Sequence, residues 1–199
     1  MAFRLFASII LNKYLMKHSF LIAAIFFLSA SASFGQRYFT KTGYVSFYSD
    51  TPIEKIEAHN KSANCVLDLN TGKLEFGVLI KGFQFEKALM QEHFNENYLE
   101  SDKYPKALFK GQIDNYSKID DTKNGKITCK ISGDLTMHGI TKKITTDAEI
   151  VVNNGKIEAE SQFNILVADY NISIPSLVKD QIAKSVKVNV RLNLEQLKM

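Results

Sequence analysis

The chain has 199 residues, enough for one or two domains, and its 45% hydrophobic and 23% charged residues are proportions typical of a folded globular protein. Most of its formal net charge of +4 comes from residues 1–35, which carry Arg4, Lys13 and Lys17 but no acidic residue, so the remainder lacks the basic excess of a nucleic-acid-binding protein. Two cysteines cannot build a disulfide-rich scaffold, and their separation matches no zinc-ribbon spacing.

The first 35 residues have the order of a secretory signal peptide. Lys17 precedes an apolar run over residues 20–30, and small residues follow from Ser29 to Ser33. A membrane anchor is the other interpretation, but the run has about half of the ~20 apolar residues that span a bilayer. We therefore expect residues 1–35 to be a signal peptide.

Removal of the expected signal peptide sets the start of the mature domain. We expect cleavage after Ala32 or Gly35, and Met16 is an alternative start. No cysteine lies near this point to carry a lipid anchor. Residues 36–199 are then expected to form a single periplasmic or secreted domain with no stable membrane span.

Period-two alternation dominates residues 36–199. In residues 186–194, apolar Val186, Val188 and Val190 alternate with polar Lys187 and Asn189. One apolar and one polar face per strand is typical of antiparallel sheets. The alternation predicts about eight strands, over residues 43–49, 62–69, 73–83, 105–116, 126–137, 141–152, 156–167 and 185–197.

Turn sequences separate these strands. Asn70-Thr71-Gly72, Asn124-Gly125 and Asn154-Gly155 lie between alternating runs. Asn and Gly tolerate the positive φ that tight hairpins require. We expect a further turn at His138-Gly139.

Two segments interrupt the alternation. Residues 86–98 carry Leu89, Met90 and Phe94 at a spacing of three to four, which predicts a short amphipathic helix. Residues 175–183 begin with a proline and predict a second helix. Because closure into a barrel removes exposed sheet edges, we expect an all-β protein, an extended eight-stranded antiparallel β-barrel with two short helical segments.

Three segments carry a family resemblance. They are Gly82-Phe83-Gln84-Phe85 leading into residues 89–100 (LMQEHFNENYLE), residues 104–111 (YPKALFKG) and residues 133–142 (GDLTMHGITK). In this order and spacing they resemble the YceI-like family of polyisoprenoid-binding proteins across essentially all of residues 36–199. The resemblance implies a lipocalin-like barrel, periplasmic or secreted, whose apolar lumen holds a polyisoprenoid chain such as a quinone tail or a prenyl lipid.

The inward faces of the predicted elements supply a lining for such a lumen. An eight-stranded barrel is wide enough either for its own side chains or for one slender ligand. Alternation alone favours a filled core, whereas the resemblance favours a ligand channel. Because apolar residues cluster beside the predicted 86–98 helix, we expect entry at one barrel end with this helix as a lid. The expected lumen residues are Phe76, Val78, Ile80, Phe83, Phe85, Leu89, Met90, Phe94, Phe109, Ile131, Leu135, Met137, Phe163, Val188 and Val190.

Few residues suggest chemistry beyond apolar binding. His93 and His138 are candidates for contact with a ligand headgroup, although a backbone-bonding role would suffice for His138 in its turn. Neither has a second histidine at metal-ligand spacing, so we expect no metal and no cofactor. Cys65 and Cys129 fall on inward faces of non-neighbouring strands, so we expect buried thiols, although an oxidising compartment would permit a disulfide.

The expected function is therefore an exported binding protein, not an enzyme, that stores or transports an isoprenoid lipid or quinone. A small outer-membrane β-barrel is an alternative, but it needs an outward apolar band with aromatic girdles, and the chain has no Trp. An enzyme acting on a hydrophobic substrate needs converging titratable groups, which the inward faces almost lack. The acidic residues Asp50, Glu54, Glu57, Asp120 and Asp121 are expected on the solvated surface.

Overall fold

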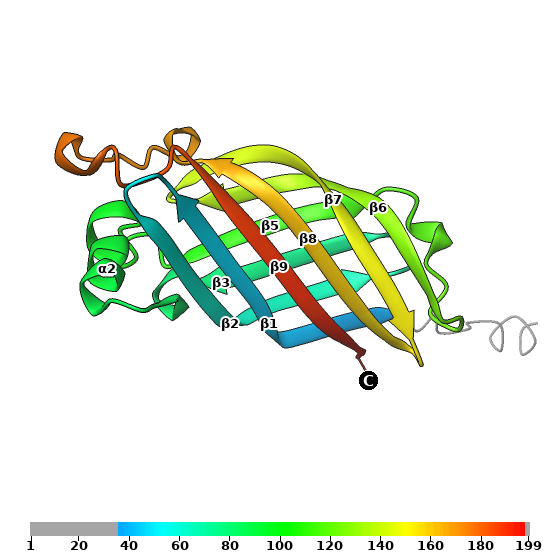
Figure 1. The fold of residues 1–199 in the computed structure, drawn as a ribbon. Helices are drawn as coiled ribbons and strands as arrows, with labels where there is room; N and C mark the ends of the chain where they lie inside the picture. The colour runs from blue at the N-terminus through cyan, green and yellow to red at the C-terminus, as the bar shows by residue number, and fades with distance from the viewer. Residues whose placement is uncertain (1–35, 198–199) are drawn as a thin grey trace, which may run out of the picture. The chain divides into compact units, whose positions relative to one another are not determined.

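The computed structural model describes residues 36–197, and the expected signal peptide lies outside this part of the chain. Within it, eight long antiparallel strands close into a barrel, which confirms the predicted architecture (Figure 1). In ring order they are β1 (Arg37–Asp50), β9 (Ser185–Gln196), β8 (Lys156–Leu166), β7 (Ile140–Asn153), β6 (Gly125–Met137), β5 (Lys106–Ile113), β3 (Lys73–Leu79) and β2 (Lys55–Asp68), which pairs back with β1. A short strand, β4 (Gln84–Phe85), pairs with the first part of β2.

The predicted strands differ from the observed ones at their ends. β2 begins at residue 55 rather than 62, because Ala58 and Asn60 fill buried inward positions without the large apolar side chains that mark a strand face in sequence. Asn60 donates a hydrogen bond to the carbonyl oxygen of Leu79 at 2.9 Å. β3 ends at Leu79 rather than residue 83, because a 3-10 turn (Ile80–Gly82) bends the chain there.

Two predicted tight turns have the expected backbone. His138-Gly139 and Asn154-Gly155 each have positive φ at both residues, 50° and 74° in both turns. Positive φ at both central residues suits the right-handed twist of a hairpin. The tight turn predicted at Asn124-Gly125 is wrong, because residues 114–124 form a longer connection that contains a 3-10 turn (Tyr116–Lys118).

One of the two predicted helices is confirmed. α2 (Ala88–His93) continues into a π-helical turn (Phe94–Tyr98), within the predicted range of residues 86–98. The helix predicted over residues 175–183 is wrong, because this stretch makes only a 3-10 turn (Ser176–Val178). Val178 lines the barrel interior while Leu177 is 93% exposed, because the connection crosses the end of the barrel irregularly instead of packing one helical face against it.

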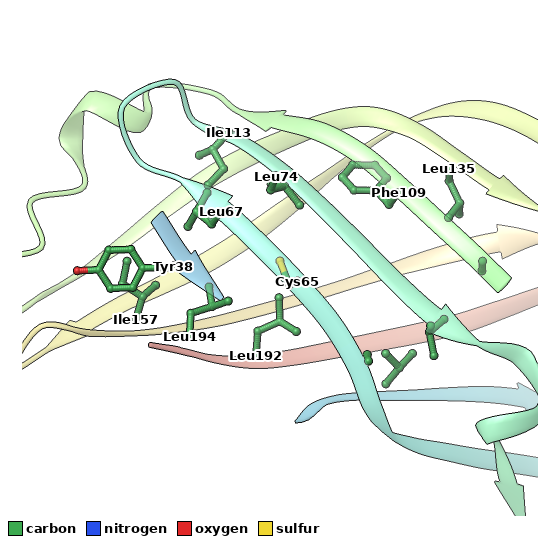
Figure 2. Packing of buried hydrophobic residues seen from close by; sticks show 14 of the residues in the cluster. Tyr38, Cys65, Leu67, Leu74, Phe109, Ile113, Leu135, Ile157, Leu192 and Leu194 are labelled. Carbon is green, nitrogen blue, oxygen red and sulfur yellow. The ribbon is translucent and has the colours of Figure 1, made fainter. Parts of the chain in front are cut away.

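One end of the barrel is filled by its own side chains. Figure 2 shows part of this packed end, which includes Tyr38, Leu67, Ile113, Ile157 and Leu194 from five different strands. Each of these five residues is at most 2% exposed. Burial of large apolar side chains is the main favourable contribution to folding, so this end anchors the barrel.

The outer face of the barrel carries charge. Lys130 pairs with Asp147 at 2.8 Å and Lys126 with Glu149 at 2.7 Å, both across β6 and β7. Helices of the described residues are all too short or too polar to cross a membrane.

Candidate ligand cavity

The half of the barrel interior beyond the packed end contains a cavity of about 330 Å³. Its lining comes from each strand of the ring, from α2 and from the connection between β8 and β9. Most of the lining side chains are aliphatic or aromatic. Pockets for small ligands occupy roughly 300–1,000 Å³, so the cavity is large enough for a slender guest.

The floor of the cavity, where it meets the packed end, is formed by residues that also belong to the buried core. Leu74, Phe109 and Leu192 line it and are each 9% exposed. Phe109 occupies the space beside Gly111 and Gly133, which face each other across β5 and β6. A Cβ atom would lie 2.5 Å from the Phe109 ring on Gly111 and 2.7 Å from it on Gly133, so the ring fits here because both residues are glycine.

Four phenylalanines close the cavity beneath α2. Phe94, at the end of the helix, packs against Phe47, Phe83 and Phe85, with ring centroids 5.3, 5.7 and 5.0 Å away. These are ordinary distances for tilted and offset aromatic pairs, which add to the stability gained from burial. The helical segment is therefore fixed to the barrel by aromatic packing as well as by its connections.

The polar groups of the lining are few, and none is a lysine or arginine among the described residues. Glu54 and Glu160 are the carboxylates of the lining, and Glu54 pairs with Lys87 at 3.1 Å. The remaining polar side chains of the lining are those of Ser49, His93, Tyr98, Thr146, Ser161 and Gln181. Burying an anion without a cationic partner is costly, so this lining suits an uncharged guest.

Most of the expected lumen residues surround the cavity. The lining includes all of them except Leu89, namely Phe76, Val78, Ile80, Phe83, Phe85, Met90, Phe94, Phe109, Ile131, Leu135, Met137, Phe163, Val188 and Val190. Leu89 is 61% exposed, so the prediction that it lies in the lumen is wrong. Successive residues of an α-helix point about 100° apart, so Leu89 faces solvent when its neighbour Met90 faces the cavity.

The two candidate histidines have different positions. His93 lines the cavity, whereas His138 does not. The Nδ1 of His138 lies 2.8 Å from the carbonyl oxygen of Tyr170, and its Nε2 lies 2.8 Å from a carboxylate oxygen of Glu100. Its ring also meets Tyr104 edge-on, with centroids 4.8 Å apart. Because both ring nitrogens have protein partners, the structure does not place His138 to contact a headgroup.

Several lining residues lie outside the set expected from the sequence. Phe47 belongs to a predicted strand, and its alternation with Val45 is a signal that identifies it. Ile172, Ile174 and Ile182 come from the connection between β8 and β9, which forms no strand and only 3-10 turns. Their inward position therefore depends on how the connection crosses the barrel, which local sequence does not encode.

The two cysteines are free thiols on β2 and β6, which β3 and β5 separate in the ring. Burial raises the pKa of Cys65 to about 12. Burial also raises the pKa of Cys129, with the carboxylates of Asp114 and Asp147 adding to the effect. Cys129 is only half-buried, less than expected. Thiols with raised pKa values are poorly suited to nucleophilic catalysis.

Comparison with known proteins identifies the family. Residues 39–194 match the model of the YceI-like domain family. The chain belongs to the YceI-like domain family. A UPF0312 protein of Vibrio campbellii is 32% identical over 108 residues, which cover 51% of this chain and 50% of that protein. A UPF0312 protein of Vibrio parahaemolyticus is 42% identical over 55 residues, which cover 28% of this chain and 25% of that protein. The matched regions thus span half or less of these relatives.

Solved structures share the YceI-like barrel. A polyisoprenoid binding domain from Saccharophagus degradans matches with a TM-score of 0.71 and 15% identity, over 82% of this chain and 99% of that one. BcnA from Burkholderia cenocepacia matches with a TM-score of 0.64 and 15% identity, over 77% and 96%. A YceI protein from Campylobacter jejuni matches with a TM-score of 0.53 and 20% identity, over 71% and 85%. At these identities the similarity concerns the fold.

Proposed function

We propose that this YceI-like protein holds an isoprenoid lipid or isoprenoid quinone in its cavity and carries or stores it in an aqueous compartment outside the cytoplasm. The observation that carries the proposal is an apolar cavity of about 330 Å³ whose lining has carboxylates but no lysine or arginine among the described residues. The Saccharophagus degradans domain of the same fold, named as polyisoprenoid binding, supports this ligand class.

The energetics of apolar transfer favour such a guest. Each buried CH₂ group contributes about 0.8 kcal/mol, so several isoprene units bind well without specific hydrogen bonds. Met90 and Met137 in the lining adapt to an irregular, methyl-branched chain because methionine is unbranched and flexible. A rigid polar ligand would leave most of this surface unmatched.

The charge of the lining narrows the ligand further. The carboxylates of the lining, Glu54 and Glu160, are already paired with Lys87 and Arg191, and the described lining contains no lysine or arginine that would bind a phosphate or diphosphate headgroup. A quinone or prenyl alcohol presents only neutral oxygen atoms, for which Ser49, Gln181 and His93 offer hydrogen-bonding groups. An uncharged isoprenoid is therefore the ligand we favour over an isoprenyl diphosphate.

The outer surface favours a carrier in water over an outer-membrane barrel. The lipid-facing surface of a membrane barrel is an apolar band, and charged side chains there are destabilising. In this protein, outward positions of β6 and β7 hold the Lys126–Glu149 and Lys130–Asp147 ion pairs. The signal-like residues 1–35 supply the route of export in this proposal.

Co-purification and thermal shift test the proposal. Protein purified from its host without detergent is extracted with organic solvent, and the extract is analysed by mass spectrometry for uncharged prenyl lipids. Added quinone at about 100 times its Kd should raise Tm by roughly 5–10 °C, because that occupancy adds about 2.7 kcal/mol to a protein of this size. Absence of a prenyl lipid together with no change in Tm contradicts the proposal.

Neighbouring positions of β8 provide a matched pair of variants. Phe163→Asp places a charge in the cavity lining, whereas Asn164→Asp places one on the exposed outer face. The first should weaken quinone binding at least tenfold because the carboxylate must be desolvated. The second should leave the Kd within about twofold. Equal weakening by both variants would show that the quinone binds elsewhere.

A further inference from the structure

The hydrogen-bonded pairing of β7 with β8 stops well before either strand ends. It extends from the Asn153–Lys156 pair to the Ala148–Ser161 pair. Beyond that point, residues 140–147 of β7 continue to pair with β6, and residues 162–166 of β8 continue to pair with β9. We call the space between these two stretches the β7–β8 gap. The two strands carry the labels β7 and β8 in Figure 1.

Side chains terminate the pairing where the strands separate. Ser161 Oγ donates a hydrogen bond to the carbonyl oxygen of Asp147 at 2.8 Å, and Thr146 Oγ1 donates to that of Gln162 at 3.3 Å. The two hydroxyl oxygens also lie 3.1 Å from each other. Carbonyl groups at the point of separation are thus satisfied by hydroxyls instead of by the opposite strand, so the pairing has a defined end.

The cavity reaches the β7–β8 gap from inside. Ile144 on β7 and Phe163 and Ile165 on β8 line the cavity and are only half-buried. Inward residues in the paired part of the same two strands are closed off, with Ile150 at 1% and Ile157 at 0% exposure. Val188 and Val190 of β9, which are paired on both sides, are half-buried as well, so half-burial by itself reflects the cavity. What distinguishes the stretch with Ile144 and Phe163 is that hydrogen bonds between β7 and β8 are missing there.

The cavity lining also includes a residue beside the end of the pairing. Glu160 points outward on β8, where it pairs with Arg191 of β9 at 3.4 Å. Both side chains are more than 60% exposed. Glu160 is nevertheless part of the cavity lining. Glu160 pairs with Glu149 of β7 one step before the pairing ends, so it lies next to the gap.

The far end of the gap is fixed by a short connection. A 3-10 turn (Val167–Tyr170) follows β8 directly, and the Tyr170 carbonyl accepts a hydrogen bond from Nδ1 of His138, in the turn that precedes β7. Val167 N–H donates to the carbonyl oxygen of Lys184 at 3.1 Å. These bonds frame the gap without crossing it. Five residues of β8 at about 3.3 Å each make its edge about 17 Å long.

Access beneath α2 would require more contacts to break. Phe94 would have to leave Phe47, Phe83 and Phe85, and Lys87 would have to leave Glu54. Widening the β7–β8 gap separates strands that share no backbone hydrogen bonds along residues 140–147 and 162–166. The gap is thus the route of lower cost for a slender guest.

We propose that the β7–β8 gap is the lateral entrance through which an apolar chain reaches the cavity. The inference rests on the proposed function for the identity of the natural guest, but the route is open to test without it. A prenyl lipid entering sideways can insert along its length, with its branches passing between Ile144 and Phe163, rather than threading from one end of the barrel.

A cleavable cross-link across the gap tests the route. Thr145→Cys and Asn164→Cys place thiols on exposed, outward positions of the two edges, in line with the register of the paired part. Cys129→Ser removes the half-buried native thiol, while burial keeps Cys65 unreactive. A short bis-maleimide with an internal disulfide joins the edges. The control joins Glu158→Cys to Asn193→Cys, which are directly paired across β8 and β9.

Uptake of diphenylhexatriene, a slender uncharged probe that fluoresces in apolar surroundings, is followed by stopped flow. The cross-link across the gap should slow uptake at least tenfold with little change in the amount bound at equilibrium. Reducing the linker should restore the rate, and the β8–β9 cross-link should change it less than twofold. Uptake at the control rate overturns the proposal, and so does a loss of equilibrium capacity without a slower rate.

The outcomes separate this proposal from the function itself. If the probe enters through the gap but no prenyl lipid is found and quinone does not raise Tm, the entrance stands and the ligand assignment fails. If quinone binds and the cross-link has no effect on uptake, the ligand assignment stands and the entrance fails.

Discussion

His93 and His138 come from segments with the same family resemblance, yet their surroundings assign them different tasks. His138 joins the turn before β7 to Tyr170 and Glu100, and its side chain is 10% exposed. His93 lies at the edge of the cavity on α2. Loss of His138 leaves a carbonyl and a carboxylate without their partner, whereas loss of His93 removes a group that faces the cavity.

We expect His138→Ala to lower the free energy of unfolding by about 1–3 kcal/mol, since the carbonyl of buried Tyr170 loses its donor and an unsatisfied buried polar group costs about that much. His93→Ala should change it by less than about 0.5 kcal/mol. Urea denaturation followed by far-ultraviolet circular dichroism measures both. Similar stability of the two variants would contradict the structural role assigned to His138.

Single-residue placement was the least predictable part of the site. The 3-to-4 spacing in residues 86–98 predicts a helix, but it does not say which of two adjacent apolar residues faces the barrel. Met90 does and Leu89 does not, because the direction is set by Phe94 packing on three other phenylalanines. That contact joins residues far apart in the sequence, so local pattern carries no information about it.

At the scale of elements, β5 and β6 approach each other closely where Gly111 faces Gly133. The Phe109 ring fills the space that side chains would otherwise take and helps to form the cavity floor. The stretch with Gly133 belongs to the family-like segment over residues 133–142. The sequence marks the segment but gives no reason for the glycine until its cross-strand partner is known.

We expect Gly133→Ala to destabilise the protein by about 2 kcal/mol or more, because the added methyl meets backbone atoms of β5 as well as the ring of Phe109. Gly125→Ala is the matched control, since it lies at the start of the same strand with nothing within 4 Å of its added Cβ. Urea midpoints of the two variants give the comparison. A Gly133 variant as stable as the control would refute the close packing.

Strand positions were predictable because each strand has one wet and one dry face, which forces period-two alternation. Residues 175–183 have apolar residues at helical spacing, which predicts a helix. The stretch forms no α-helix, and only Ser176–Val178 makes a 3-10 turn. Ala183 N–H donates to Ser49 Oγ at 2.8 Å, which ties this stretch to β1. Such tertiary ties override local propensity and cannot be inferred from spacing. The sequence also gives no sign that the β7–β8 pairing ends early, because apolar and polar residues continue to alternate in both strands beyond that point.

For the whole molecule, the packed end contains a group that links stability to pH. Tyr38 donates a hydrogen bond from its phenol to Asp121 at 2.8 Å. Burial raises its pKa above the usual 10, and the Asp121 hydrogen bond and charge raise it further. Asp121 was expected to be a solvated surface residue, and its role as acceptor for a core tyrosine is visible only in the fold.

The raised pKa predicts alkaline destabilisation. Below pH 10 the phenol is protonated in both states, so its contribution is fully present. Above pH 10 it ionises first in the unfolded chain, and the free energy of unfolding falls by up to about 1.4 kcal/mol per pH unit until the folded pKa is reached. Urea titrations between pH 9 and 11.5 measure this slope.

Tyr38→Phe separates this effect from other groups. Lysines and the remaining tyrosines are common to both proteins, so the difference in slope belongs to Tyr38 alone. The variant should lose about 1 kcal/mol at pH 7 with its hydrogen bond, and its stability should fall less steeply above pH 10. Parallel curves for the two proteins would contradict the assignment.

The uneven filling of the barrel has a consequence for how its sequence can diverge. Substitutions around Ile157 or Leu194 remove tight packing and threaten the fold, whereas those around Val188 or Phe163 border free space. Under the proposed function, ligand preference can therefore change during evolution while the folded state survives, because the residues around the free space are largely not those that pack the closed end of the barrel.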